Sequence, residues 1–199
     1  MYRILELSKL KDYFITSIKN INSNLYLNSE YHGKSHAERV CLYAYLISNY
    51  INLPEDQIRN VIIASLLHDI GKTHEYNKDN HGYNAVKKIG DLSVFIDSNE
   101  SINEIKFLIE AHSLDRNSLS IIDLLKKYNI SNINSCLKTL NVLMDADALD
   151  RTRFDSLGNN YSKLDSSYLR IPVSHRLVDI SRFISQLYYD KSSKVLIKK

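Results

Sequence analysis

The adjacent residues His68 and Asp69 are the first feature of this sequence with side chains that can do chemistry. They lie in an otherwise apolar run, Val61 to Lys72 (VIIASLLHDIGK), which has the composition of a buried helix. An imidazole and a carboxylate taken out of water need compensation of several kcal/mol, and a bound cation supplies it to both. We therefore expect a metal site at the end of this helix, with further ligands elsewhere in the chain.

Four other segments place His or Asp at expected helix ends or loop boundaries. They are HGKSH at 32–36, HG at 81–82, AHS at 111–113 and DADALDR at 145–151. Side chains at the ends of different helices can converge on one point. A lone His on a mostly apolar helix is more often a hydrogen-bonded core or surface residue, so the pair at 68–69 is what makes the others candidate ligands.

In order and spacing, these residues resemble the H…HD…D signature of the HD superfamily, metal-dependent phosphohydrolases and phosphodiesterases with an all-helical core. The strings HAERV, LLHDIGK and LMDADALDR are similar to the family's motifs, and the matching core spans about residues 31–153. The resemblance implies that one metal ion is held by His36, His68, Asp69 and Asp145.

The resemblance extends to His81 and His112, which fall where family members with a binuclear centre carry extra ligands. Asp69 would then bridge two cations ~3.5–4 Å apart, which activate a water molecule and hold a phosphoryl oxygen. A set of His and Asp ligands suits Mn, Fe, Co, Ni or Zn better than Mg, which prefers oxygen ligands. The alternative is a single ion, with His81 and His112 lining the pocket and contacting phosphate.

Other candidate catalytic and substrate-binding residues lie close to these ligands in the sequence. Besides Asp69 itself, the HGxxH string makes His32 a candidate to protonate a leaving group or to line the pocket. Lys72 resembles the family's phosphate-contacting lysine. Arg153 and Arg170 are candidate phosphate ligands because a guanidinium matches phosphate bidentately.

The acidic residues around Asp145 are expected to have structural roles. Two positions apart on a helix correspond to a rotation of about 200°, so Asp147 should face away from Asp145 and make a structural hydrogen bond. Asp150 and Arg151 are interpreted in the same way.

The elements that must position these residues are predicted to be helices. The chain has only two prolines and five glycines, and apolar residues recur at helical spacing in most segments, which indicates an all-α fold. Helices are expected within residues 1–29, from Ser35, over 54–69, 83–89, 101–112, 121–128 and 133–151, and from Ser174. Without a repeat or linker, residues 1–199 are predicted to form one HD-type helical bundle, with the first and last helices packed on the core. The loops around residues 73–81 and 154–172 are expected to decide what enters the site.

Composition limits the partners. The net charge of +3 comes from 26 basic and 23 acidic residues spread along the chain, so we expect no long nucleic acid as a partner. No apolar run approaches the ~20 residues of a spanning helix, and no signal peptide is recognised. Cys41 and Cys136 lie in apolar helical patterns and are expected to be reduced thiols. A cytoplasmic protein without a membrane partner is predicted, with secretion as an effector left open.

The function predicted from these observations is that of a metal-dependent phosphoric ester hydrolase. We expect a phosphodiesterase that acts on a nucleotide or nucleotidyl-type phosphoester through metal-activated water, and neither a G-x-S-x-G motif nor a P-loop competes with this interpretation. A di-iron oxygenase of the same fold and a non-catalytic nucleotide-sensing module are the alternatives. The string HGxxHxxRV at 32–40 is loosely similar to bacterial effectors that act on ADP-ribosylated or phosphoribosyl-linked ubiquitin. The substrate, the oligomeric state and the pathway stay open.

Overall fold

The computed structural model describes residues 2–29, 31–75, 80–89, 99–114, 119–155 and 163–196. This part of the chain contains α-helices and short 3-10 helices and no β-strand, which confirms the all-α prediction. The α-helices are α1 (Tyr2–Asn20), α2 (Lys34–Tyr50), α3 (Glu55–Leu67), α4 (His81–Ile89), α5 (Asn99–Ala111), α6 (Leu119–Lys127), α7 (Ile133–Leu149), α8 (Pro172–Arg176) and α9 (Val178–Leu196). The 3-10 helices are η1 (Ser23–Leu25), η3 (Asp150–Phe154) and η4 (Ser166–Tyr168).

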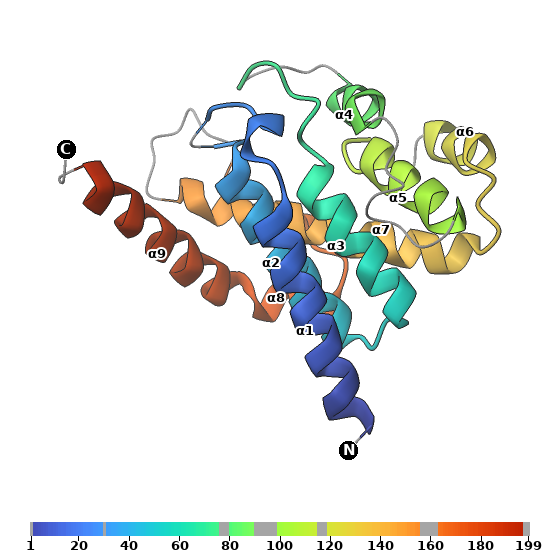
Figure 1. Cartoon of the computed structure of the whole chain (residues 1–199), viewed down its shortest axis with the longest axis horizontal. Coiled ribbons are helices and arrows are strands. Elements are labelled where there is room, and N and C mark those ends of the chain that lie inside the picture. Colours follow the sequence, from blue (N-terminus) through green and yellow to red (C-terminus); the bar gives the residue numbers. More distant parts are fainter. Residues whose placement is uncertain are drawn as a thin grey trace.

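The centre of the fold is formed by α2, α3 and α7, which pack against one another, with α5 against α3 and α7 (Figure 1). Apolar side chains of these helices, such as Tyr43, Ile62, Phe107 and Leu140, are fully buried at their contacts. Burying a side chain of this size contributes about 1.5–3 kcal/mol. The helices that carry or precede His36, His68 and Asp147 therefore lie in the buried core of the fold.

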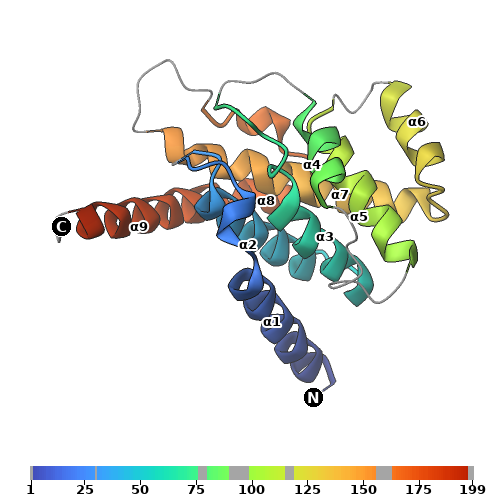
Figure 2. The same cartoon turned by 45° about the horizontal axis from the view of Figure 1, so that its top comes forward.

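The remaining helices lie outside this centre. α4 packs on α5, α1 contacts α3, and α9 contacts α2 and η3. Figures 1 and 2 show that the N-terminal end of α1 and the C-terminal end of α9 extend away from the other helices. Ahead of α2, the Tyr26 hydroxyl donates a hydrogen bond of 2.6 Å to the carbonyl oxygen of Leu66, which holds the segment before His32 against the end of α3.

Several helix boundaries differ from the sequence prediction. α4 begins at His81 rather than at Tyr83, because Asn80 accepts N–H bonds from Tyr83 through its side chain and from Asn84 through its carbonyl oxygen. The last predicted helix is two helices, α8 and α9, and Leu177 is the C-cap residue that ends α8. The helix predicted over 133–151 ends at Leu149 and continues as η3.

Both predicted entry loops are only partly described. Residues 76–79 of the first loop and 156–162 of the second lie outside the described residues. The described part of the second loop contains η4, whose N-cap residue Asp165 accepts an N–H bond from Ser167.

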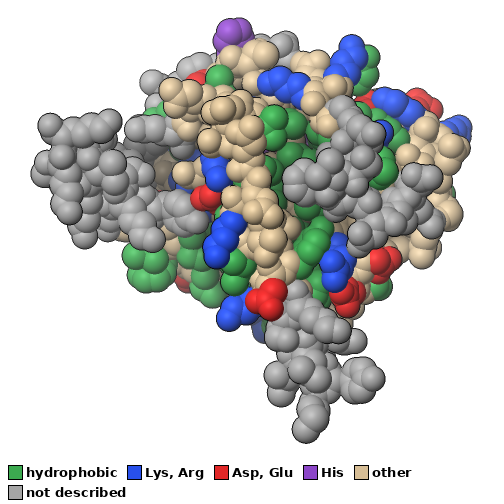
Figure 3. All heavy atoms as spheres, in the orientation of Figure 1, with side chains coloured by type: hydrophobic (Ala, Val, Ile, Leu, Met, Phe, Trp, Pro, Cys, Tyr) green, Lys and Arg blue, Asp and Glu red, His purple; other side chains and the backbone are tan. Residues whose placement is uncertain are grey.

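The side chains on the described surface are of mixed type. On the face shown in Figure 3, Lys and Arg side chains lie among acidic, apolar and neutral ones. A search of the described residues finds no helix with the length and apolarity needed to cross a membrane. Cys41 and Cys136 are both buried free thiols.

Candidate metal centre

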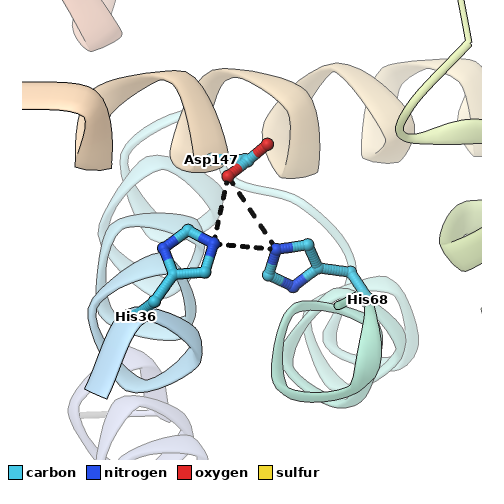
Figure 4. A group of neighbouring side chains, drawn as sticks. All are labelled: His36, His68 and Asp147. Carbon is cyan, nitrogen blue, oxygen red and sulfur yellow. Dashed lines mark hydrogen bonds and ion pairs between the residues drawn. The ribbon is translucent and has the colours of Figure 1, made fainter. Parts of the chain in front are cut away.

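Three buried or half-buried side chains from three different elements point toward one another in the interior (Figure 4). His36 lies in the first turn of α2, His68 follows the last residue of α3, and Asp147 lies in the last turn of α7. The Nε2 atoms of the two histidines are 3.2 Å apart, and Asp147 Oδ1 lies 3.4 Å from His36 Nε2 and 3.8 Å from His68 Nε2. These atoms are close enough to hold one metal ion.

Asp69 lies between this group and a second group of imidazoles. Its Oδ2 atom is 3.4 Å from His36 Nε2 and 3.8 Å from His68 Nε2. Its other oxygen, Oδ1, is 3.4 Å from His81 Nε2 and 3.8 Å from His112 Nε2. The two oxygens of one carboxylate therefore face two different sets of nitrogen ligands.

The second group depends on a close approach of α4 to its neighbours. His81 Nε2 and His112 Nε2 are 3.0 Å apart, and His112 also forms a possible metal-binding group with His68 and Asp69. A Cβ atom on Gly82 would lie 2.5 Å from the carbonyl oxygen of Ile109 in α5, and one on Gly71 would lie 2.1 Å from the carbonyl oxygen of His81. Only glycine at both positions lets the backbone of α4 come near enough to bring His81 to the cluster.

In three histidines, a hydrogen bond at Nδ1 fixes the orientation of the ring. His68 Nδ1 lies 2.7 Å from the carbonyl oxygen three residues before it, and His112 Nδ1 makes the same contact at 2.6 Å. His36 Nδ1 lies 2.7 Å from Asp150 Oδ2. Because carbonyl and carboxylate oxygens only accept hydrogen bonds, Nδ1 carries the hydrogen in each ring. The Nε2 lone pair of each neutral ring is then directed into the cluster, as metal-ligating histidines require.

This arrangement fits a bound cation. The Nε2 atoms of His36 and His68, 3.2 Å apart, would otherwise present two lone pairs to each other unless one ring took up a second proton. A cation placed against both nitrogens removes that conflict, and ionised Asp69 and Asp147 balance its charge. A mixture of imidazole and carboxylate donors suits Mn, Fe, Co, Ni and Zn.

The electrostatics favour ionised carboxylates at the cluster. Burial and the nearby Arg153 lower the pKa of His36, but the carboxylates around it outweigh both and raise that pKa to about 10. Burial lowers the pKa of His68 to about 4. Burial raises the pKa of Asp69 and Asp147, but the neighbouring imidazoles hold both well below their usual range.

Asp145, a metal ligand in the sequence prediction, lies outside this cluster in the structure. Its fully buried carboxylate accepts backbone N–H bonds from Arg170 at 3.0 Å and from Ile171 at 2.8 Å. Asp145 therefore ties α7 to the segment before α8. The predicted rotation between the two aspartates is consistent with these contacts, but Asp147, expected to be structural, is the one that faces His36.

Two predicted catalytic residues lie beside the cluster. Lys72 Nζ is 4.0 Å from Asp69 Oδ1, and its side chain is only 10% exposed. The ring of His32 lies edge-on to that of His36, with centroids 5.7 Å apart, and its Nδ1 is 2.6 Å from Glu75 Oε2. Burial lowers the pKa of His32, and the hydrogen bond to Glu75 opposes that shift. No sequence signal marked Glu75, since it lies in a polar loop 43 positions from its partner.

The two predicted phosphate-binding arginines lie in different places. Arg153 Nη1 donates to Asp150 Oδ2 at 2.8 Å, while its buried Nε atom has no hydrogen-bond partner among the described residues. Arg170 Nη1 lies 3.5 Å from Asp145 Oδ1 and donates to the Tyr168 carbonyl oxygen at 2.9 Å. The structure brings Arg153 to Asp150, which also bonds to His36, and Arg170 to Asp145.

Comparison with protein families finds that the HD domain model matches residues 34–152. The matched range contains the clustered residues His36, His68, Asp69, His81, His112 and Asp147. Comparisons with curated proteins and with solved structures find no match.

Proposed function

The chain belongs to the HD domain family of metal-dependent phosphohydrolases, and from that premise we propose that it hydrolyses a phosphodiester at a centre of two divalent metal ions. The proposed substrate class is a nucleotide or a nucleotidyl group. The observation that carries the proposal is the position of Asp69, whose Oδ2 and Oδ1 atoms each lie 3.4 Å from the Nε2 atom of a histidine in a different group. A carboxylate in this position suits a bridge between two ions.

We assign the ligands from these distances. One ion would be held by His36, His68, Asp69 and Asp147, and the other by Asp69, His81 and His112. When bound, such ions polarise a phosphoryl oxygen and lower the pKa of water, which makes water a nucleophile at neutral pH.

Two basic side chains are assigned to the phosphoryl group. Lys72 has a mostly buried ammonium group beside Asp69, and it can pair with a phosphoryl oxygen once the charge of the carboxylate is shared with metal. Arg153 offers a buried Nε–H that has no acceptor among the described residues. A phosphate oxygen is a strong acceptor for such a donor, and a charge-assisted bond to a buried guanidinium is stronger than one between neutral groups.

His32 is assigned to the leaving group. Glu75 accepts the hydrogen of its Nδ1 atom, which fixes the ring and opposes the lowering of the His32 pKa by burial. A proton taken up from solvent at Nε2 is then the one that His32 can donate. In hydrolysis the oxygen of water forms a bond to phosphorus while the bond from phosphorus to the leaving oxygen breaks. His32 would give its proton to that leaving oxygen, and water would lose one to solvent.

The test combines elemental analysis with a substrate panel. Purified protein would be assayed with Mn²⁺, Fe²⁺, Co²⁺, Ni²⁺ and Mg²⁺ against small nucleotides, cyclic and linear dinucleotides, and ADP-ribosylated or phosphoribosyl-linked ubiquitin. We expect two ions per chain and one preferred phosphoester. Asp69→Ala should lose both ions and turnover, whereas Asp123→Ala, an exposed aspartate of α6, should keep both. Hydrolysis at the wild-type rate by metal-free Asp69→Ala would end the proposal.

The same experiment separates the alternatives. Tightly bound iron with oxygen consumption and no phosphoester cleavage would indicate a di-iron oxygenase. Nucleotide binding at saturating metal without any product would indicate a sensing module. Either result would contradict the hydrolase proposal.

A further inference from the structure

Asp150 is a buried carboxylate whose described hydrogen-bond partners are cationic side chains and one imidazole. It is the first residue of η3 and is fully buried. Arg39 donates through Nε to Oδ1 at 2.6 Å and through Nη2 to Oδ2 at 2.9 Å. Arg153 Nη1 and His36 Nδ1 donate to the same Oδ2 atom at 2.8 Å and 2.7 Å.

The geometry of these bonds fixes the orientation of the carboxylate. A guanidinium that bonds both oxygens of a carboxylate holds the two groups in one plane, which adds geometric specificity to the charge attraction. The fork of Arg39 therefore prevents Asp150 from rotating, and Oδ2 remains directed at His36. The side chain of Arg39 is itself buried, so solvent does not compete for these bonds.

A merely structural role explains this arrangement poorly. Charges buried in this way carry a large desolvation cost, and replacing them with packed apolar side chains is often neutral or stabilising. Asp145 provides the contrast, because it lies on α7, is equally buried, and bonds to backbone N–H groups as a structural clamp would. The partners of Asp150 instead include a candidate metal ligand and a candidate phosphate ligand.

We infer that Asp150 is a positioning residue for one metal site. Held by Arg39 and Arg153, it fixes the His36 ring with Nε2 directed at the ion bound with His68 and Asp147. The inference rests on the proposed metal centre and concerns only one of its two sites. The carboxylate of Asp150 bonds to His36, whereas the second site is formed by His81 and His112 at the Oδ1 atom of Asp69.

The experiment is a titration of metal-free protein with Co²⁺, in which binding is measured by calorimetry and by the visible absorption of the bound ion. The two binding events are assigned with His112→Ala, which should bind Co²⁺ only at the site that contains His36. Asp150→Asn should weaken that event 10–100-fold, the usual loss when a hydrogen-bond partner of a metal ligand is removed, and should change the other event less than twofold. Asp145→Asn, the matched control, should lower the melting temperature and leave both affinities unchanged.

A second variant covers the case in which Asp150→Asn does not fold. Arg39→Lys keeps a positive charge beside Asp150 but removes the fork, and it should weaken the same binding event several-fold with the other event unchanged. Unaltered Co²⁺ binding in both variants, or equal weakening of both events, would overturn the inference while leaving the two-metal proposal in place. A wild-type protein that binds no Co²⁺ at all would overturn both.

Discussion

Replacing Gly82 by alanine should remove one metal ion and leave the other. The new Cβ atom would lie 2.5 Å from the carbonyl oxygen of Ile109 and 2.9 Å from that of Glu110. Ordinary contact between such atoms begins at 3.4 Å, so the backbones of α4 and α5 must separate by about 0.9 Å, the difference from 2.5 Å. Neither obstacle can rotate away, because both are backbone atoms.

That separation acts directly on the second group of ligands. His81 precedes Gly82 in α4, and His112 follows the end of α5, so a shift between the two helices changes the distance between the two imidazoles. Metal sites tolerate deviations of only about 0.2 Å in ligand distances, which is much less than the expected shift. The first group lies on α2, α3 and α7 and should be unaffected. We expect one ion per chain in place of two.

Helix propensity alone predicts that Gly82→Ala is more stable than the wild type, since alanine is favoured over glycine in a helix by about 1 kcal/mol. The assay is elemental analysis after dialysis against Mn²⁺, together with the melting temperature of the metal-free protein. Lys87→Ala, an exposed position on α4, is the control and should retain two ions. A Gly82→Ala protein that holds two ions at wild-type affinity and melts higher would refute the close-approach argument.

Three further predictions concern other parts of the chain. Asp147→Ala should lose one ion and change the free energy of unfolding of metal-free protein by less than about 1 kcal/mol. Asp145→Ala should keep both ions, and its free energy of unfolding, measured in urea, should be lower by about 2–6 kcal/mol, because two backbone N–H groups lose their acceptor at about 1–3 kcal/mol each. Loss of an ion in Asp145→Ala and not in Asp147→Ala would contradict the ligand assignment. Burial raises the pKa of Cys41 and Cys136 to about 12, so both thiols should alkylate slowly at pH 8 in native protein and quickly in urea. Thiols of the unfolded chain ionise near pH 9.0, so above that pH the unfolded state binds fewer protons than the folded state. The free energy of unfolding should therefore fall as the pH rises toward 12. An increase over this range would be inconsistent with buried thiols. Removal of metal with a chelator should lower the melting temperature, and Mn²⁺ should restore it; an unchanged melting temperature would indicate that metal does not bind the folded state.

The sequence predicted the helices well because apolar spacing reports which face of each helix is buried. It predicted their ends less well, since the ends depend on local hydrogen bonds that spacing does not report. The start of α4 at His81 depends on Asn80, and α8 ends at its C-cap residue Leu177.

The candidate ligands His36, His68, Asp69, His81 and His112 were all predicted, and the structure brings them together. The structure places Asp147 rather than Asp145 beside these residues, for a physical reason. Helical geometry fixes the angle between Asp145 and Asp147 but not which of them faces the other ligands. That choice depends on the backbone at Arg170 and Ile171, which offers Asp145 its partners from 25 residues away.

One signal in the sequence favours Asp147 over Asp145 as the residue at the cluster. Asp147 and Asp150 are three positions apart and therefore lie on the same side of a helix, whereas Asp145 does not share that side. If Asp147 is a metal ligand and Asp150 positions His36, both side chains are expected on the same face of the helix. Glu75 and the contacts of Arg39 had no such signal, because their partners are distant in sequence.

The central claim is that Asp69 bridges two metal ions, and anomalous diffraction from a crystal of Mn²⁺-bound protein tests it most directly. We predict two anomalous peaks ~3.5–4 Å apart, as in other two-metal centres, with one oxygen of Asp69 bound to each. His36, His68 and Asp147 should contact one peak, and His81 and His112 the other. A single peak, or two peaks that both lie on the same oxygen of Asp69, would contradict the claim.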